Sequence, residues 1–458
     1  MSLKLHPISF TLDTLPPSQS RQSIPPPAVP IKRPDPLPAR VELYIGDITA
    51  PGALGSEDIL VISANPSETL VGSSAIQSWL SGLGWSATSG NAWFSLAPSR
   101  SADIYFGGTT GFGHILEWNP KYGPLTPQQA APYRTDDIFF GAQAIWGHTP
   151  KSIMIPVTSG SNGWFEAVTI FRSLLHSALK VGGWRDYVPS AIKFVIDKPD
   201  KSLTDAFDAI ATNYDGLRGA PNKKPGMGTT PANMPNKDTT PFSHFRDRAN
   251  SWMASYWSGV KDINPITEMQ AYAINIYTDD YFHPIQCYLR NSVESPSRSV
   301  LPDFQEANFT DLNNPDYIAM IPYYAVLSAG LLNISAFHGT TFRGLGGKAP
   351  WAKFTPGSKV RVVSYMSSAD EFASAGLPWM YSTNPPWKTT FHIRTQSQTA
   401  RDISPYSWHP YEREHLYDFG FSEYVTSHEP RGLTNPGNPG FKANFATSEI
   451  PRSLQSLV

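Results

Sequence analysis

Runs of apolar residues separated by turn-forming residues divide the first half of the chain into short strands. The segments at residues 41–49, 58–65, 152–157 and 191–197 each contain such a run, rich in isoleucine, leucine and valine. Continuous apolar runs of this length are typical of strands that are buried on both faces of a parallel sheet. The residues from Phe165 to about residue 181 predict a helix, so strands and helices alternate in this half.

The second half shows a different pattern, in which strands carry paired polar groups. Residues 389–395 and 421–425 are rich in β-branched and aromatic side chains, as strands are. Between them, one residue separates Glu412 from Glu414. On a strand these two carboxylates point to the same face, which is unfavourable unless a cationic group binds there. The alternative is a solvated edge strand whose charge prevents aggregation.

Proline-rich and glycine-rich segments suggest the domain boundaries. Residues 14–38 are dense in proline, and residues 216–241 combine proline, glycine and asparagine, which sustain neither helix nor strand. A chain of 458 residues also exceeds the size at which single cores stop growing. We therefore assign a proline-rich leader to residues 1–38, a first domain to 39–215, a linker to 216–241, a second domain to 242–430 and a tail to 431–458.

Composition limits the possible partners. The formal net charge of −2 gives no general attraction to nucleic acid, and no apolar stretch approaches a membrane span or a secretory signal. We expect a protein that is cytoplasmic or delivered by a route without a cleavable signal peptide. Its single cysteine, Cys287, excludes a disulfide framework and cysteine-based metal clusters, and we expect no metal cofactor.

Several segments of the second half occur in the order found in one enzyme family. Residues 341–344 read aromatic-Arg-Gly, and residues 354–368 carry a Pro-Gly turn, a Val-Arg strand and an aromatic-x-Ser-Ser run. A Thr-x-Phe-x-Ile-x-Thr strand at 389–395 and the Glu-x-Glu at 412–414 follow. Together with the helical preamble at 271–290, these motifs resemble the arginine–serine–glutamate class of mono-ADP-ribosyltransferases, which includes bacterial toxins. The resemblance spans roughly residues 262–428 and implies an α+β domain of the split β-sandwich kind.

This resemblance implies NAD as substrate and a role for each motif residue. Arg343, followed by Gly344, would bind the diphosphate, since a guanidinium offers a planar fork of donors. Ser367 would orient the glutamate and the ribose. Glu414 would bind a ribose hydroxyl and stabilise the positive charge at the anomeric carbon. Glu412 would face the acceptor, and a glutamate there accompanies arginine acceptors in the family.

The chain departs from the family pattern at two places. Ala369 stands where many relatives have a second serine, which removes one hydrogen bond from that network. The residues 337–340, Phe-His-Gly-Thr, are similar to the histidine strand of poly-ADP-ribose polymerases. Only one of His338 and Arg343 can fill the NAD-binding strand position. We favour Arg343, and the alternative for His338 is an ordinary half-buried histidine.

The first half resembles a macrodomain over about residues 39–200. A Gly-Asp-Ile-Thr turn contains Asp47, a strand ends at Asn65, and the glycine loop at 158–164 leads from a strand into a helix. Such a loop can cradle phosphate with backbone N–H groups and the positive helix end. The resemblance implies a three-layer α/β fold in which Asp47, Asn65, Gly160 and Gly163 would bind ADP-ribose. For Asp47 and the two glycines, the alternative is ordinary turn and loop geometry.

The first half also departs from its family. The loop at residues 70–76 has one glycine, and Ile62 stands where many members have asparagine. A degenerate domain that has lost ADP-ribose binding is therefore an open alternative to a binding domain, and hydrolysis of ADP-ribose from proteins is a third.

From the two resemblances, we expect transfer of ADP-ribose from NAD to a protein side chain, arginine being favoured. The macro-like domain would bind ADP-ribose on targets or limit self-modification. We then expect a toxin or effector whose partners are its acceptor protein and a host activator or cognate inhibitor. Two alternatives are an NAD glycohydrolase toxin and an inactive ADP-ribose-binding scaffold.

Overall fold

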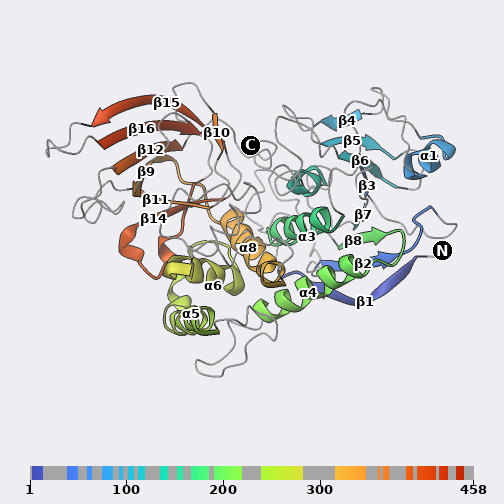
Figure 1. The fold of residues 1–458 in the computed structure, drawn as a ribbon, viewed down its shortest axis with the longest axis horizontal. Helices are drawn as coiled ribbons and strands as arrows, with labels where there is room; N and C mark the ends of the chain where they lie inside the picture. Colours follow the sequence, from blue (N-terminus) through green and yellow to red (C-terminus); the bar gives the residue numbers. More distant parts are fainter. Residues whose placement is uncertain are drawn as a thin grey trace, which may run out of the picture. The chain divides into compact units, whose positions relative to one another are not determined.

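The computed structural model describes residues 3–13, 39–49, 59–63, 75–85, 92–95, 102–107, 112–118, 135–142, 152–157, 167–184, 190–218, 239–281, 315–346, 359–361, 365–370, 388–395, 400–418, 422–431 and 440–447. The chain forms two compact units (Figure 1). The first comprises Met1–Gly219, Thr230–Met234 and Ile318–Ala329, and the second comprises Ala220–Thr229, Pro235–Tyr317 and Gly330–Val458.

A mixed sheet forms the centre of the first unit. Its described strands lie in the order β1-β2-β8-β7-β3-β6-β5-β4. The central strands β2, β8, β7, β3 and β6 run parallel, whereas β1, β5 and β4 pair antiparallel with their neighbours. The strands are β1 (Lys4–Thr11), β2 (Arg40–Ile45), β3 (Ile59–Ser63), β4 (Ala92–Ser95), β5 (Ala102–Phe106), β6 (His114–Trp118), β7 (Ser152–Pro156) and β8 (Ala191–Ile196). The apolar runs therefore form parallel strands, as their pattern predicts.

Helices cover both faces of this sheet. The helices are α1 (Ala75–Gly82), a helix at residues 135–142, α3 (Ala167–Gly182) and α4 (Lys201–Arg218). On β8, Val195 belongs to the core cluster that contains Leu80 of α1. The preceding residue of β8, Phe194, instead contacts Phe171 of α3, and Phe171 stacks on Phe207 of α4. Because adjacent strand residues face opposite sides, the unit has three layers.

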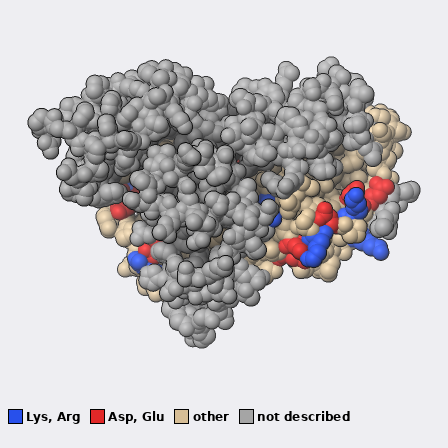
Figure 2. Space-filling model, in the orientation of Figure 1, with Lys and Arg blue, Asp and Glu red and all other residues tan. Residues whose placement is uncertain are grey.

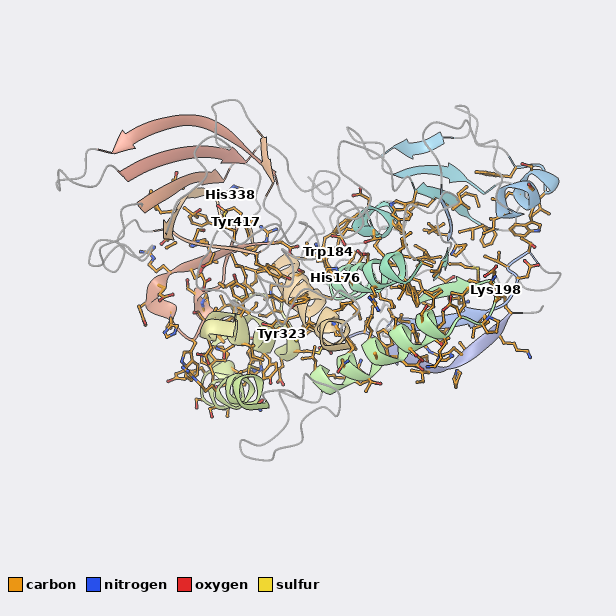
Figure 3. All side chains as sticks on the ribbon, in the orientation of Figure 1. His176, Trp184, Lys198, Tyr323, His338 and Tyr417 are labelled. Atoms are coloured by element: carbon orange, nitrogen blue, oxygen red, sulfur yellow. The ribbon has the colours of Figure 1, made fainter. Side chains whose placement is uncertain are left out.

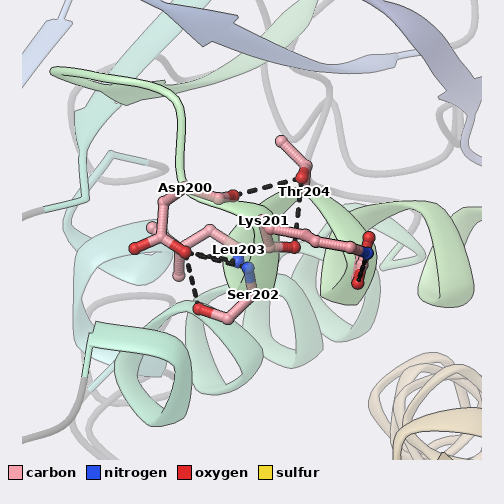
Figure 4. Close-up of polar contacts among 6 residues, drawn as sticks. Asp200, Lys201, Ser202, Leu203 and Thr204 are labelled. Carbon is pink, nitrogen blue, oxygen red and sulfur yellow. Dashed lines mark hydrogen bonds and ion pairs between the residues drawn. The ribbon is translucent and has the colours of Figure 1, made fainter.

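The α4 helix begins at a capped end. The carboxylate of Asp200 accepts hydrogen bonds from the backbone amides of Ser202 and Leu203, at 2.9 and 3.3 Å, and from the Ser202 hydroxyl (Figure 4). These bonds satisfy amides that have no partner within the helix. Lys201 forms an exposed ion pair with Asp205 one turn later. On the described surface in Figure 2, basic and acidic side chains are interspersed.

The structure of residues 4–11 corrects the predicted boundary between the leader and the first domain. We assigned residues 1–38 to a leader, but Lys4–Thr11 form β1, which pairs antiparallel with β2. Phe10 on this strand is buried and contacts Phe207 and Tyr214 of α4. Burial of this aromatic side chain explains why the segment joins the sheet although a proline-rich run follows it. Residues 14–38 lie outside the described residues.

The second unit has a helical part that precedes its strands. The elements are α5 (Thr239–Val260), α6 (Glu268–Ile276), the π-helix η3 (Tyr277–Tyr281) and α8 (Pro315–Asn333). The central residues of α8, Ile318–Ala329, group with the first unit. Thr267 and Gln270 form a capping box at the start of α6, and Asn333 also donates to Gln270. None of the described helices combines the length and apolar character needed to cross a membrane. Residues 271–276 are helical as predicted, while residues 285–290 lie outside the described part.

A second sheet follows these helices. Its described strands lie in the order β10-β15-β16-β12-β9-β11-β14-β13, and all neighbours are antiparallel except β12 and β16. They are β9 (Gly339–Gly346), β10 (Lys359–Arg361), β11 (Met366–Ala369), β12 (Lys388–Thr395), β13 (Ala400–Asp402), β14 (Glu414–Tyr417), β15 (Ser422–Arg431) and β16 (Gly440–Thr447). At the β9–β11 junction the paired positions are Ala369 and Phe342. Helices followed by strands make this half an α+β unit, as expected.

The assignment of the C-terminal segment also needs a correction. We assigned residues 431–458 to a tail, but Gly440–Thr447 form β16, which lies between β12 and β15. Apolar residues alternate in this segment at Phe441, Ala443 and Phe445, a strand pattern that the surrounding proline and glycine residues obscure. In the assigned linker, α4 continues to Arg218 and α5 begins at Thr239.

Candidate active site

Glu414 and Ser367 meet on neighbouring strands of the second sheet. The β14 strand lies between β11 and β13, and its first residue, Glu414, pairs with Ala369 of β11. Ser367 lies two residues before Ala369, so its side chain is on the same face as that of Glu414. The Ser367 hydroxyl donates a hydrogen bond to Oε1 of Glu414. Glu414 is only 7% exposed, which makes it a buried carboxylate held by a serine.

The backbone around Glu414 is anchored on both sides. Its carbonyl oxygen accepts a hydrogen bond from the Ile403 amide at 3.0 Å, next to β13. On the β11 side, the Ser368 hydroxyl donates to the carbonyl oxygen of His415 at 3.0 Å. These bonds restrain the strand ends that carry the carboxylate. Ala369, which replaces the second serine of the expected motif, lies directly opposite Glu414 and has no hydroxyl to donate.

The position of Glu412 corrects the expected strand pair. Pro410–Glu412 form a 3-10 turn, η7, and Arg413 has a left-handed backbone with φ of 49°. The strand begins only at Glu414, so the two carboxylates do not lie on one strand. Glu412 is exposed on the turn, whereas Glu414 is buried. The left-handed residue between them breaks the alternation on which the strand prediction depended.

The helical part of the unit positions the segment before this turn. The Arg248 guanidinium of α5 lies over the ring of Trp408, 4.5 Å from its centroid, and forms an ion pair with Asp279 at 2.9 Å. The backbone amide of Trp408 donates to the Thr278 hydroxyl at 2.9 Å. Both Thr278 and Asp279 belong to the π-helix η3, and π-helical turns occur frequently at functional sites.

The expected NAD-binding strand lies beside the strand that carries Ser367. Arg343 and Gly344 are on β9, which pairs with β11 on one side and β12 on the other. The side-chain placement of Arg343 is outside what the structure describes. His338 is exposed one residue before β9 begins (Figure 3). The neighbouring Gly339 has a packing explanation, because a Cβ atom there would lie 2.8 Å from the Phe337 ring.

In the first unit, one expected ligand-binding residue is described. Asp47 is exposed after β2, and it accepts hydrogen bonds from the Thr49 hydroxyl at 2.6 Å and amide at 2.8 Å. These bonds lower the pKa of Asp47 from its usual value. Asn65, Gly160 and Gly163 lie outside the described residues. The structure thus brings Ser367 and Glu414 together but does not test the expected ADP-ribose pocket.

Sequence reasoning missed an ion pair beside Glu414. Arg413 Nη2 lies 2.6 Å from Oδ2 of Asp370, the residue that follows β11. An acidic residue directly after the Ser-Ser-Ala strand and a basic residue within Glu-x-Glu were the available signals. Among the described residues, no group of histidine, cysteine or acidic side chains has the arrangement of a metal site.

Comparison with known proteins gives a structural likeness without a family assignment. No protein-family model matches the chain, and no curated protein matches it. Similar solved structures include Vis toxin, an ADP-ribosyltransferase from Vibrio splendidus, which is 16% identical to this chain. That similarity covers 45% of this chain and 84% of Vis toxin, with a TM-score of 0.31. The ADP-ribosyltransferase HopU1 of Pseudomonas syringae pv. tomato has 17% identity, 51% and 96% coverage, and a TM-score of 0.33.

A further similar structure holds bound partners. Exoenzyme S from Pseudomonas aeruginosa, in complex with human 14-3-3 protein beta and bound to carba-NAD, has 13% identity to this chain. The similarity covers 45% of this chain and 89% of that chain, with a TM-score of 0.29. Each of these three alignments covers about half of this chain, at TM-scores between 0.29 and 0.33.

Proposed function

We propose that the second unit is a mono-ADP-ribosyltransferase that transfers ADP-ribose from NAD to a protein side chain, with arginine as the acceptor. The observation that carries this proposal is the hydrogen bond from Ser367 to the buried carboxylate of Glu414. The strand of Arg343 lies beside this pair, in the sheet order β9-β11-β14. An arginine, a serine and a glutamate on three adjacent strands fit the requirements of NAD cleavage.

Glu414 supplies the electrostatic part of the reaction. When the bond between nicotinamide and ribose breaks, the electron pair leaves with nicotinamide and the ribose becomes an oxocarbenium-like cation. A carboxylate at about 4 Å from this charge stabilises it by about 4 kcal/mol at an effective dielectric constant of about 20. That energy corresponds to roughly a thousandfold in rate. The Ser367 hydroxyl orients the carboxylate, so the stabilising group is in place before the charge develops.

The remaining residues bind the substrate ends. Arg343 would hold the NAD diphosphate, because a guanidinium donates to two phosphate oxygens at once, and Gly344 would allow close approach. His338 is the competing candidate for this position. Glu412, exposed on the turn, would hold the acceptor guanidinium. Its carboxylate would take the proton that the attacking nitrogen loses as the new bond to the ribose carbon forms.

The first unit would serve as an ADP-ribose-binding accessory domain of the macrodomain kind. Its mixed sheet with helices on both faces supports this proposal, and the sequence between β7 and α3 contains Gly160 and Gly163. Titration of ADP-ribose into the full chain carrying Glu414→Gln should give saturable binding. Adding Asp47→Ala should weaken it. Unchanged binding after Asp47→Ala would remove Asp47 from the site, and absent binding would indicate a degenerate domain.

Incubation of the full chain with labelled NAD and a cell lysate tests the catalytic proposal. Native chain should label a protein, and Glu414→Gln should abolish the label. Asp262→Asn, which changes an exposed carboxylate of the same unit, serves as the matched control and should label normally. Absence of NAD turnover with native chain, both in buffer and in lysate, would contradict the proposal.

The same assay separates transferase from glycohydrolase. Glu412→Gln should remove label from protein while nicotinamide release continues. The guanidinium acceptor is a cation that a carboxylate must hold, whereas water is neutral and needs no such group. Nicotinamide release by native chain without any labelled protein would favour the glycohydrolase. Turnover that appears only with lysate would indicate an activator protein, and exoenzyme S is a solved example of a complex with 14-3-3 protein beta.

A further inference from the structure

We propose that Asp370 and Arg413 are positioning residues that hold Glu412 for the acceptor. Their ion pair would thereby decide whether ADP-ribose passes to a guanidine or to water. This inference rests on the proposed transferase function and adds a specificity device to it. Neither residue was assigned a role by the motifs described above.

The backbone at Arg413 gives the first reason. Among the described residues, it is the non-glycine residue with a positive φ, at 49°. A side chain with a Cβ atom disfavours this conformation, and glycine or asparagine usually occupies it. An arginine in this place therefore requires a compensating contact elsewhere in the residue.

The ion pair provides that contact. Ala369 pairs with Glu414, so Asp370 and Arg413 are the next residues along the two antiparallel strands. Their side chains join at 2.6 Å, and the side chains are 16% and 49% exposed respectively. Oδ1 of Asp370 is buried and finds no hydrogen-bond partner in the described structure. Losing Arg413 would therefore leave a largely buried carboxylate without its observed partner.

Backbone bonds complete the restraint of the turn. The Glu412 amide donates to the His409 carbonyl at 3.0 Å, and the Arg413 amide donates to the Pro410 carbonyl at 3.3 Å. Nδ1 of His415 lies 3.0 Å from the Arg413 carbonyl oxygen. Glu412 thus projects from a turn whose backbone is held at both ends, which restrains its position relative to Glu414.

A fixed turn matters for one acceptor and not for the other. A guanidinium must be held with its nitrogen close to the ribose carbon, and a misplacement of about 1 Å can cost roughly a hundredfold in rate. Water reaches the same carbon without being held. Loosening the turn should therefore reduce transfer more than hydrolysis, because the groups that stabilise NAD cleavage lie on the strands.

The test uses the full chain, NAD and the small guanidine agmatine, with ADP-ribosyl-agmatine and free ADP-ribose measured separately. Asp370→Asn removes the charge, and Arg413→Gly removes the ion pair while allowing the left-handed backbone. A charge-swapped variant, Asp370→Arg with Arg413→Asp, restores an ion pair of the opposite orientation. Asp205→Asn, in the exposed pair with Lys201, is the matched control.

We expect each single variant to lower the ratio of transfer to hydrolysis by roughly tenfold. The charge-swapped variant should recover part of the ratio, and Asp205→Asn should leave it unchanged. Amide hydrogen exchange at residues 410–414 should become faster in Asp370→Asn, which measures the turn independently of activity.

If a variant loses both activities in parallel, or if the ratio of transfer to hydrolysis is unchanged, this inference is overturned. The proposed transferase function of the native chain would still stand. Exchange that stays slow at residues 410–414 in Asp370→Asn would also overturn this inference. Failure of native chain to cleave NAD would overturn the proposed function and this inference together, so the two failures are distinguishable.

Discussion

Each unit of this protein buries a carboxylate that accepts a hydrogen bond from a serine hydroxyl. In the first unit, Asp136 accepts from Ser177 and also forms an ion pair with Lys180 at 2.7 Å. These groups lie on the helix at residues 135–142 and on α3. In the second unit, Glu414 accepts from Ser367 at the end of a strand, next to an exposed turn.

The two sites differ in what surrounds the serine–carboxylate contact. Asp136 is balanced by a buried cation that lies on the same scaffold, so its interaction joins two helices. Glu414 stands beside a turn that presents another carboxylate, Glu412, to solvent. The expected results below therefore separate losses of stability from losses of activity.

The largest expected effect is on catalysis at Glu414. Glu414→Gln should slow nicotinamide release by roughly a thousandfold, since the amide lacks the charge that stabilises the oxocarbenium ion. The free energy of unfolding should change by less than about 1 kcal/mol, because the amide oxygen still accepts from Ser367. Denaturant unfolding beside the NAD assay measures both, and a large loss of stability would break the comparison.

The same chemical change in the first unit should have the opposite result. Asp136→Asn removes the buried carboxylate that pairs with Lys180 and should lower the free energy of unfolding by about 3 kcal/mol. Nicotinamide release at a temperature where the variant is folded should equal that of the native chain. The exposed pair offers the control, since Asp205→Asn should cost less than about 1 kcal/mol. An NAD assay that collapses with Asp136→Asn would show that the site has a role beyond stability.

Packing beside Glu414 gives an intermediate effect. Gly339→Ala would place a Cβ atom 2.8 Å from the Phe337 ring, which itself lies 4.1 Å from the His415 ring. Displacement of this ring should cost about 2 kcal/mol of stability and should lower activity as the strand that carries Glu414 shifts. Thermal unfolding and NAD cleavage measure the two losses. Full activity in a destabilised variant would separate the packing from the site.

Alkaline pH should affect the first unit through Tyr214. Burial raises the pKa of this phenol, which accepts a hydrogen bond from the Asp13 amide at 2.7 Å. A raised pKa stabilises the fold below the unfolded value of about 10, and that contribution is lost as the pH rises further. Tyr214→Phe should cost about 1–1.5 kcal/mol at neutral pH and flatten the alkaline loss. Denaturant unfolding from pH 8 to pH 11 tests this, and an equal slope in both proteins would assign the loss elsewhere.

The smallest expected effect is at the start of α4. Hydrogen bonds from the Ser202 hydroxyl and the Leu203 amide lower the pKa of Asp200. Its stabilising contribution is therefore present above the unfolded pKa and is lost as the pH falls below it. Asp200→Ala should cost about 1 kcal/mol at neutral pH and less in acid. Thermal unfolding at two pH values measures this, with Ser202→Ala as a milder companion that keeps the backbone cap.

The parts predictable from the sequence are those decided by local pattern. Continuous apolar runs placed β2, β3, β7 and β8, and the helix after β7 was expected close to its observed span. The strand β16 was missed because adjoining proline and glycine residues suggested a tail. Its pairing with β12 and β15 depends on residues far away in the chain.

The contact between two residues of the candidate site could be anticipated from the sequence, but the backbone at Glu412 could not. The motifs selected Ser367 and Glu414, and the register of β11 against β14 brings them into contact. The turn at Glu412 was not predictable, because arginine has no intrinsic preference for a left-handed conformation. That conformation at Arg413 accompanies the ion pair with Asp370, a contact that the sequence does not display.

The place of β16 has a consequence for biosynthesis. This strand is made after every other described element of its sheet, yet it lies between β12 and β15. While a ribosome still holds residue 447, the strands that carry Ser367 and Glu414 have been translated, but their sheet lacks an interior member. Pairing of β10 and β15 with the rest of the sheet must therefore wait until translation has passed this segment, and chains released early would lack the strand that joins β15 to β12.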